Sequence, residues 1–218
     1  MAGNAPLLVH GAPMPTAAPK LPATFFQGPD VLRIARSLLG KHLYTNLGGV
    51  VTAGRVVETE AYRHEGDNSL ALHLQRKRQQ AQGLYLPGGH AYIYTVYNRH
   101  ALFNIATHDA AHPDAVLIRA VEPTVGIPEM LRRRGLPAAA RALTAGPGVL
   151  TQALGITPAL TGVVVAGEVL WFEDHGEKVA EADIIASSRV GLEYAGAEAV
   201  ELPWRFRIKG SPWTSPAK

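Results

Sequence analysis

One run of β-branched residues most constrains the fold: residues 50–57 continue without a break into Glu58-Thr59-Glu60-Ala61-Tyr62. Valine and threonine pack well on a pleated surface, so residues 49–61 are predicted to form a strand. Side chains alternate between the two faces of a strand, which places Glu58, Glu60 and Tyr62 on the same face. Two carboxylates beside a phenol on a buried strand are costly without partners or a purpose, so this strand end is the first candidate site.

The rest of the chain is organised as short strand-like segments separated by polar stretches that contain glycine and proline. Strands and longer helices do not alternate as they do in parallel sheets. With 218 residues, of which 47% are hydrophobic, the chain can bury one substantial core. The sequence therefore predicts an α+β fold, a single domain with a curved, mostly antiparallel β-sheet core flanked by short helices. The predicted strands are 41–45, 49–61, 90–97, 101–106, 115–121, 163–172 and 204–208, and the predicted helices are 29–40, 126–135 and 149–154.

The first 22 residues carry prolines among alanines and glycines, without the basic-then-apolar layout of a secretory signal. We expect residues 1–22 to be a mobile N-terminal tail and residues 23–218 to be the folded domain. No stretch approaches the roughly 20 apolar residues that span a bilayer, so no membrane association is predicted. The chain has no cysteine, which excludes disulfides, thiolate zinc sites and cysteine nucleophiles and fits a reducing cytoplasm.

Histidine and basic residues give weaker signals. His108 and His112 share a loop that lacks a convincing carboxylate partner, so neither a metal site nor a cofactor is predicted. The two basic runs, residues 76–78 and 132–134, leave two interpretations open: contacts to phosphates, or solvated faces of a helix or loop.

A second informative segment, residues 90–97, carries three tyrosines. In a strand, Tyr92 and Tyr94 lie on one face and Tyr97 on the other. A tyrosine ring suits stacking on a flat base, and it suits packing in a core equally well. The segment alone does not decide between these interpretations.

Several segments gain meaning from their order along the chain. They are residues 55–62, 87–97, 103–105, 116–123, 145–148, 188–191 and 209–213. In this order the chain resembles the alkyladenine (3-methyladenine) DNA glycosylases, the eukaryotic-type family also found in many bacteria, over about residues 25–212. The resemblance implies an enzyme that flips an alkylated purine out of double-stranded DNA and hydrolyses its N-glycosidic bond, leaving an abasic site. It implies 3-methyladenine as the chief substrate, with 7-methylguanine and hypoxanthine beside it, and a cytoplasmic, nucleoid-associated monomer.

The resemblance also assigns catalytic roles. Glu60 matches the family's general base, which activates a water for attack on the sugar, and Arg119 matches an arginine near that water and the target phosphate. Glu58 is interpreted as part of the scaffold. Two alternatives remain open: Glu60 as a structural acid paired with a basic residue such as Arg119, and Arg119 as a neutraliser of Glu122 or Glu58.

The pocket residues follow in the same way. Tyr62 and Tyr94 match the rings that stack on the extruded base, and Tyr97 matches the side chain inserted into the duplex. Asn104 matches the residue that disfavours the exocyclic amine of guanine, and a plain strand-end asparagine is its alternative. The basic residues expected to bind DNA are Arg76, Lys77, Arg78, Arg99 and Lys209.

The sequence departs from the family pattern in the pocket. The position of the usual pocket histidine falls on Ala71 when the chain is followed without gaps from Glu60, and His73 comes two residues later. We favour an altered pocket wall at Ala71 over a shifted loop that brings in His73, and expect base selectivity to change accordingly. Val149 stands where a lysine is usual after the Gly-Pro-Gly turn.

Two other functions stay open beside a monofunctional glycosylase. A non-catalytic damaged-DNA-binding protein of the same fold would gain nothing from Glu60, since a carboxylate repels an anionic ligand. A hydrolase or transferase acting on a small nucleoside would have no duplex gap for Tyr97 to fill. Neither tyrosine-bearing segment contains a lysine, so a Schiff-base intermediate and strand nicking are not expected.

Overall fold

Strand β2 (Val50–Tyr62) is the central strand of one eight-stranded sheet in the computed structural model, which describes residues 18–216. It pairs with β5 (Asp114–Val125) on one side, and with β1 (His42–Leu47) and β8 (Arg205–Ile208) on the other. The sheet runs in the order β3-β4-β5-β2-β1-β6, and β7 pairs with β8. The remaining strands are β3 (Ala91–Val96), β4 (His100–Thr107), β6 (Leu170–Glu173) and β7 (Ile184–Ser187).

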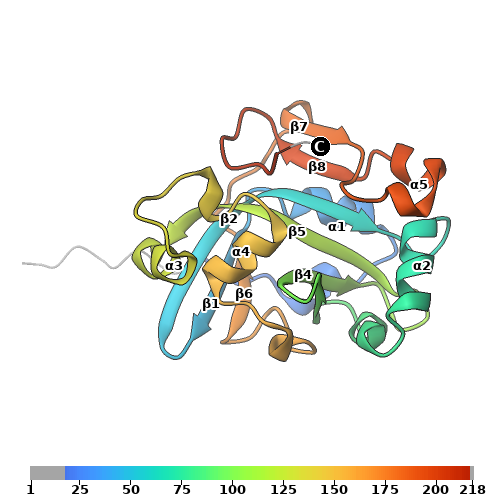
Figure 1. Ribbon diagram of the computed structural model, residues 1–218, viewed down its shortest axis with the longest axis horizontal. Helices are drawn as coiled ribbons and strands as arrows, with labels where there is room; N and C mark the ends of the chain where they lie inside the picture. The colour runs from blue at the N-terminus through green and yellow to red at the C-terminus, as the bar shows by residue number, and fades with distance from the viewer. Residues whose placement is uncertain (1–17, 217–218) are drawn as a thin grey trace, which may run out of the picture.

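Every pairing between these strands is antiparallel, and the sheet is strongly curled (Figure 1). The predicted α+β single domain with a curved antiparallel core is thereby confirmed. The pairing of β2 with β5 shifts register on both sides of Glu58. Such irregularities re-aim side chains, and this one lies at the acidic end of the strand.

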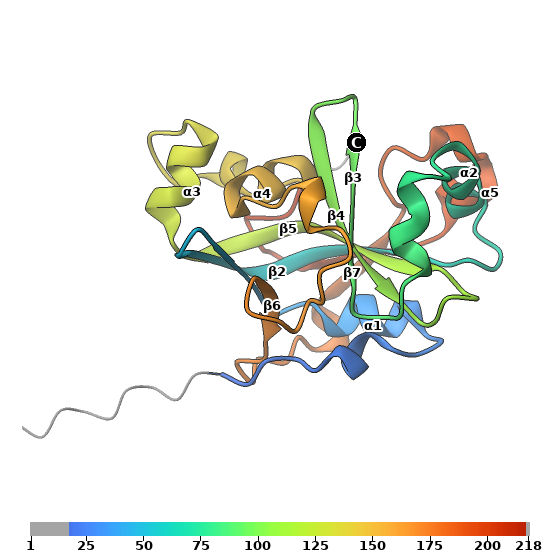
Figure 2. The same ribbon diagram turned by 90° about the horizontal axis from the view of Figure 1, so that it is seen from below.

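Short helices flank the sheet, namely α1 (Val31–Ser37), α2 (Asn68–Arg76), α3 (Ile127–Arg134), α4 (Pro147–Leu154) and α5 (Ala197–Glu201). Figure 2 shows the β3–β4 hairpin projecting from the sheet, with α3 and α4 to one side of it and α2 and α5 to the other. In the described part of the chain, every helix is too short or too polar to cross a membrane.

Four elements differ from the sequence prediction. The strand predicted at 163–172 is confined to β6, because residues 163–169 form a loop held by single bridges from Val164 to His90 and from Ala166 to Trp171. Helix α2 lies in a stretch for which neither a helix nor a strand was predicted. Strand β7 and helix α5 were not predicted either.

The chain joins the fold before the predicted boundary at residue 22. Residues 1–17 of the expected tail lie outside the described residues. The backbone N–H of Leu21 donates to the carbonyl of Phe172 at 2.8 Å, and the backbone of Lys20 forms an isolated antiparallel β-bridge with that of Glu173. Leu21 is also buried in the main core, so the boundary at 22 is wrong by a few residues.

Two apolar clusters lie within the domain. The larger one includes the fully buried rings of Phe26, Phe103, Phe172 and Phe206. The smaller one joins α2 to the hairpin, and its members are Leu70, Ala81, Leu84, Tyr92 and Ala115. Tyr62 and Tyr94 pack against this smaller cluster, so it forms the floor on which the candidate site is built.

Candidate active site

A cavity of about 690 Å³ opens beside the β3–β4 hairpin. Its walls come from the end of β2, α2, the helical turn at residues 80–85, β3, β4, β5, the start of α4 and the loop at residues 190–194. This volume lies in the range of small-molecule sites. Five of the residues predicted to catalyse the reaction or bind the substrate, from five different elements, line it together: Tyr62, His73, Tyr94, Asn104 and Arg119.

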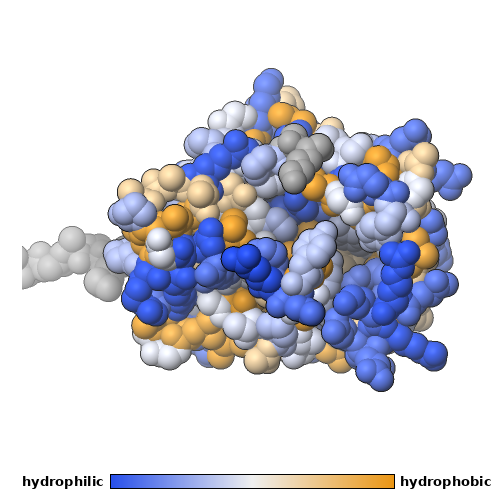
Figure 3. Space-filling view, viewed as in Figure 1, coloured by the Kyte–Doolittle hydropathy of each residue, from blue (hydrophilic) through white to orange (hydrophobic). Residues whose placement is uncertain are grey.

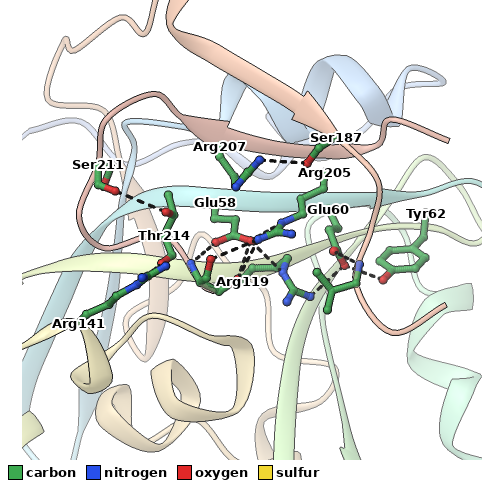
Figure 4. A network of polar contacts seen from close by, with 12 residues as sticks. Glu58, Glu60, Tyr62, Arg119, Arg141, Ser187, Arg205, Arg207, Ser211 and Thr214 are labelled. Atoms are coloured by element: carbon green, nitrogen blue, oxygen red, sulfur yellow. Dashed lines mark hydrogen bonds and ion pairs between the residues drawn. The ribbon is translucent and has the colours of Figure 1, made fainter. Parts of the chain in front are cut away.

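Glu60 is fully buried beside this cavity, and three donors hold its carboxylate. Oε1 accepts from the backbone N–H of Val190 at 2.9 Å, and Oε2 accepts from the Tyr62 hydroxyl at 2.8 Å. Arg119 Nη1 lies 3.2 Å from the same Oε2 (Figure 4). An ionised carboxylate has about four acceptor sites, so these three contacts leave one for a further donor such as water.

Arg119 lies between two carboxylates. Its Nη1 faces Glu60, and its Nε donates to Glu58 Oε1 at 3.1 Å. Burial acts to lower the pKa of Arg119, but the charges of Glu60 and Glu58 outweigh it and raise that pKa. The pairs of Arg119 with Glu60 and with Glu58, which the two structural alternatives for these residues require, are therefore both present. Glu122 pairs with Arg55 instead of Arg119.

Aromatic rings form the walls. Tyr94 stacks on Tyr92 with 5.5 Å between ring centroids, and the His73 ring lies 4.6 Å from Tyr94. His73 Nε2 is hydrogen-bonded to the Tyr92 hydroxyl at 2.8 Å. Burial, with a smaller effect of the Lys77 charge, lowers the pKa of His73 to about 4, so the cavity presents a neutral imidazole at physiological pH. Burial and the Glu60 charge raise the pKa of Tyr62 well above its usual value, which keeps the phenol protonated.

The favoured pocket wall at Ala71 is wrong. Helix α2 turns Ser69, Leu70 and His73 into the cavity, whereas Ala71 is exposed and does not line it. Residues two apart on a helix point about 200° away from each other, so His73 and Ala71 cannot share a face. The available signal was Asp67, whose side chain accepts from the N–H of Ser69 and caps the helix.

Asn104 lies in β4 and is 4% exposed. Its amide nitrogen donates to the carbonyls of Tyr92 and Leu102 at 3.4 and 3.3 Å. The Asn104 side chain thus hydrogen-bonds within its own sheet, as a plain structural asparagine would, and it also lines the cavity.

The rim of the cavity carries four of the residues predicted to contact DNA, namely Tyr97, Arg99, Arg76 and Lys77. Tyr97 is 92% exposed at the hairpin tip, and both Tyr97 and Asn98 have positive φ angles, of 52° and 50°. Arg99 is exposed at the same tip, while Arg76 and Lys77 line the cavity. Figure 3 shows strongly hydrophilic side chains on this face over α2 and over α3.

The remaining basic residues lie in different surroundings. Arg78 is exposed, and Lys209 is exposed in the turn after β8 and does not line the cavity. Arg132 and Arg133 both pair with Glu129, and Arg134 bonds to Gln152. The run at residues 132–134 is therefore held by contacts within the protein, which leaves fewer of its donors for phosphates.

One buried ion pair beneath the site was not predicted. Arg189 donates to both oxygens of Asp67, at 2.5 and 2.8 Å, and to the carbonyl of Ala61 at 3.0 Å. Its guanidinium also lies 4.6 Å from the centre of the Tyr62 ring. This pair joins the end of β2, the cap of α2 and the segment that carries Val190. The sequence pointed to residues 188–191 but assigned them no role.

The loop between β4 and β5 differs from its prediction. Asp109 lies between the two histidines, with Oδ2 3.3 Å from His108 Nδ1 and Oδ1 2.9 Å from His112 Nδ1. A carboxylate partner is thus present where none was recognised. Ligand atoms of the three residues lie within 4.8 Å of one another. Asp109 already accepts hydrogen bonds from His112 and from the N–H of Ala111.

Comparison with known proteins places this geometry in context. The model of the family described as "Methylpurine-DNA glycosylase (MPG)" matches residues 24–212. A protein of Chlorobaculum parvum named "Putative 3-methyladenine DNA glycosylase" is 43% identical over 198 residues, which cover 90% of both chains. Proteins with the same name from Chlamydia felis and Shouchella clausii are 39% and 38% identical, over 86% and 85% of this chain and 95% and 90% of their own.

Proposed function

The chain belongs to the methylpurine-DNA glycosylase family, and from that premise we propose that it excises alkylated purines from double-stranded DNA. In this proposal the damaged base is flipped into the cavity and its N-glycosidic bond is hydrolysed, leaving an abasic site. The substrates are 3-methyladenine and, beside it, 7-methylguanine and hypoxanthine. The observation that carries the proposal is Glu60, a buried carboxylate held by Tyr62, Arg119 and Val190 at the edge of an aromatic cavity.

Binding of the base rests on the aromatic walls. Tyr62, Tyr94 and His73 offer faces for a flat purine, and the cavity volume accommodates one. N-alkylated purine nucleosides carry positive charge, which electron-rich tyrosine rings attract. Asn104 also lines the cavity, and in this proposal it meets the edge of the base and disfavours the exocyclic amine of guanine.

Hydrolysis rests on Glu60. A water bound at its free acceptor site attacks the anomeric carbon, the bond from that carbon to the base nitrogen breaks, and the electron pair leaves with the base. The proton of the water passes to Glu60. The negative carboxylate also stabilises the oxocarbenium-like sugar, and Arg119 holds the carboxylate in place.

The proposed reaction needs no covalent enzyme intermediate. The partners of Glu60 are a phenol, a guanidinium and a backbone amide. Among the residues that line the cavity, Lys77 is the one lysine. Borohydride reduction during turnover checks this directly: we expect no trapped adduct, and an adduct lost in the Lys77→Ala variant would contradict a monofunctional mechanism.

DNA is held in this proposal by the rim of the cavity. Tyr97 fills the gap left by the flipped base, because its ring projects from the hairpin tip with almost no contact to the protein. The residues proposed to contact phosphates are Arg76, Lys77, Arg78, Arg99 and Lys209. The enzyme acts as a monomer without a cofactor.

A lesion panel tests the proposed function. The protein is incubated with duplexes that each hold one 7-methylguanine or hypoxanthine, then treated with alkali to cut abasic sites, and 3-methyladenine released from methylated DNA is measured by chromatography. We expect release of 3-methyladenine and strand cleavage at one or both other lesions. Tight binding of every damaged duplex without any release would instead support the non-catalytic alternative.

A further inference from the structure

We infer that Ser215, near the C-terminal end, is a positioning residue for the active site: it fixes Glu58, which in turn holds Arg119 against Glu60. The inference rests on the proposed function and deepens it. Ser215 and Glu58 do not line the cavity, so both act through Arg119 and not on the substrate.

Glu58 is the centre of this arrangement. It is fully buried, and its Oε1 accepts three hydrogen bonds: from Arg119 Nε at 3.1 Å, Arg205 Nε at 2.7 Å and Ser215 Oγ at 2.7 Å. Its Oε2 accepts from the backbone N–H of Ser215 at 2.5 Å. Ser215 is thus the residue that holds both oxygens of the Glu58 carboxylate.

The C-terminal segment has its own anchors. After β8 the chain turns back, and the carbonyl of Thr214 accepts from Arg141 Nε at 2.8 Å. Arg205 Nη2 lies 3.3 Å from both the carbonyl and the hydroxyl of Ser215, which is 3% exposed. These contacts place Ser215 independently of Glu58, so the segment can serve as a fixed point for that carboxylate.

The charges explain why the fixed point matters. Two carboxylates, Glu58 and Glu60, face two guanidinium groups, Arg119 and Arg205, in a buried set (Figure 4). Arg119 divides its donors, with Nε on Glu58 and Nη1 on Glu60. Without Ser215, Glu58 Oε2 would lose its donor, and a buried carboxylate oxygen without a donor is costly.

The replacement donors at hand are the guanidinium groups of Arg119 and Arg205, which both already contact Glu58 Oε1. Rotation of Glu58 to recruit a second N–H from Arg119 would turn the guanidinium away from Glu60. The proposed base would then lose the contact that orients it and share less of the positive charge. Misplacement of catalytic groups by about 1 Å can lower rates by about 100-fold. Because Ser215 and Glu58 do not line the cavity, the loss is expected in the chemical step and not in DNA binding.

Two truncations form a matched test. The protein ending at Thr214 loses Ser215, whereas the protein ending at Pro216 keeps every contact described above. We expect the Thr214 truncation to lower the single-turnover excision rate by about 10- to 100-fold and to change affinity for the damaged duplex by less than about 2-fold. Its profile of rate against pH should also change shape, while the Pro216 truncation behaves as the full chain.

Point variants cover the case in which the Thr214 truncation does not fold. Ser215→Ala removes only the hydroxyl contacts and should lower the rate by about 3- to 10-fold, whereas Ser215→Thr, which keeps the hydroxyl, should restore it. Wild-type rates and pH profiles for both Ser215→Ala and a folded Thr214 truncation would overturn the inference. Equal loss of rate in Ser215→Ala and Ser215→Thr would overturn it as well.

A spectroscopic measurement separates this inference from the proposed function. The ¹H–¹⁵N resonance of Arg119 Nε–H, assigned with an Arg119→Lys variant, should shift in Ser215→Ala, which removes the hydroxyl donor to the oxygen that Arg119 shares, and shift further in the Thr214 truncation, which removes both donors. If the full chain excises no base from any duplex, the proposed function fails, but the shift still shows that Ser215 positions Arg119. An unshifted resonance contradicts the positioning role whatever the activity.

Discussion

The hydroxyl of Tyr62 donates a 2.8 Å hydrogen bond to Glu60 Oε2, so one wall of the cavity is bonded directly to the proposed catalytic carboxylate. The same oxygen faces Arg119, and the other faces the N–H of Val190. Residues from β2, β5 and the segment after β7 thus meet at one functional group. In the proposed mechanism, binding of the nucleobase and orientation of the Glu60 carboxylate are therefore linked through Tyr62.

Tyr62→Phe tests that link. The variant keeps the aromatic wall and removes the donor, and hydrogen bonds to charged groups are worth about 1.5–3 kcal/mol. We expect the single-turnover excision rate to fall about 10-fold with duplex affinity nearly unchanged. Tyr85→Phe, at a half-exposed tyrosine outside the cavity, is the control. A drop in affinity without a drop in rate would show that the hydroxyl does not orient Glu60.

Substitutions on α2 test the corrected pocket wall. His73→Ala removes the ring beside Tyr94 and the bond to the Tyr92 hydroxyl, so base selectivity and excision should both change. Ala71→Ser should be silent, because that side chain is exposed. Competition between 7-methylguanine and hypoxanthine duplexes measures selectivity. If Ala71→Ser changed the selectivity between the two duplexes and His73→Ala did not, Ala71 would form the pocket wall, as the sequence analysis expected.

His73 also predicts a pH dependence of stability. Its pKa is lowered from 6.5 to about 4 in the folded protein, so the unfolded chain binds the proton first as pH falls. The stabilising contribution is complete above about pH 6.5 and is lost progressively toward pH 4. We therefore expect the melting temperature of the wild type to fall more steeply over this window than that of His73→Gln.

The buried pair of Asp67 and Arg189 predicts a large effect on stability. Asp67→Asn leaves the guanidinium buried without its counter-charge, and breaking such a pair costs about 3–5 kcal/mol. Urea unfolding should show a loss of that size, against little change for Glu193→Gln on the surface nearby. A loss below about 1 kcal/mol would mean that Arg189 is not held by Asp67.

Replacement of Tyr97 is expected to affect activity on DNA and not stability. Because the side chain is 92% exposed, Tyr97→Ala should leave the melting temperature unchanged. It should lower excision from duplex DNA much more than excision from single-stranded DNA, which has no gap to fill. Equal losses on the two substrates would argue against insertion into the duplex.

Much of the fold could be read from local sequence, and the failures have physical causes. The β-branched run of β2 and the tyrosine-rich β3 are strands because their side chains suit a pleated surface. Residues 163–165 are equally β-branched but bond to the chain around residues 89–91 as a loop. Helix α2 was missed because it lies in a polar stretch with weak periodicity, and it is held by the smaller core cluster and the Asp67 cap.

The candidate site was predicted in part for a related reason. Residue types marked the strand end from Glu58 to Tyr62, because two carboxylates beside a phenol are costly on a buried strand, whereas the roles of Glu60 and Tyr94 came from the resemblance to a known family. The contact between Glu60 and Arg119 depends on the register of β2 with β5, and the contact between Glu58 and Ser215 joins residues 157 apart in the chain. No local pattern encodes such distances, so the network around Glu58 emerged only from the folded structure.

The most direct test of the account is the excision rate of Glu60→Gln on a duplex with one lesion that the wild type removes. Glutamine preserves the shape of the side chain but cannot accept the proton of the attacking water. General-base catalysis contributes about 10²- to 10⁴-fold, so we expect the single-turnover rate to fall by that factor while the variant still binds the damaged duplex. A Glu60→Gln protein that excises the base within about 10-fold of the wild-type rate would contradict the assignment of Glu60 as the catalytic base.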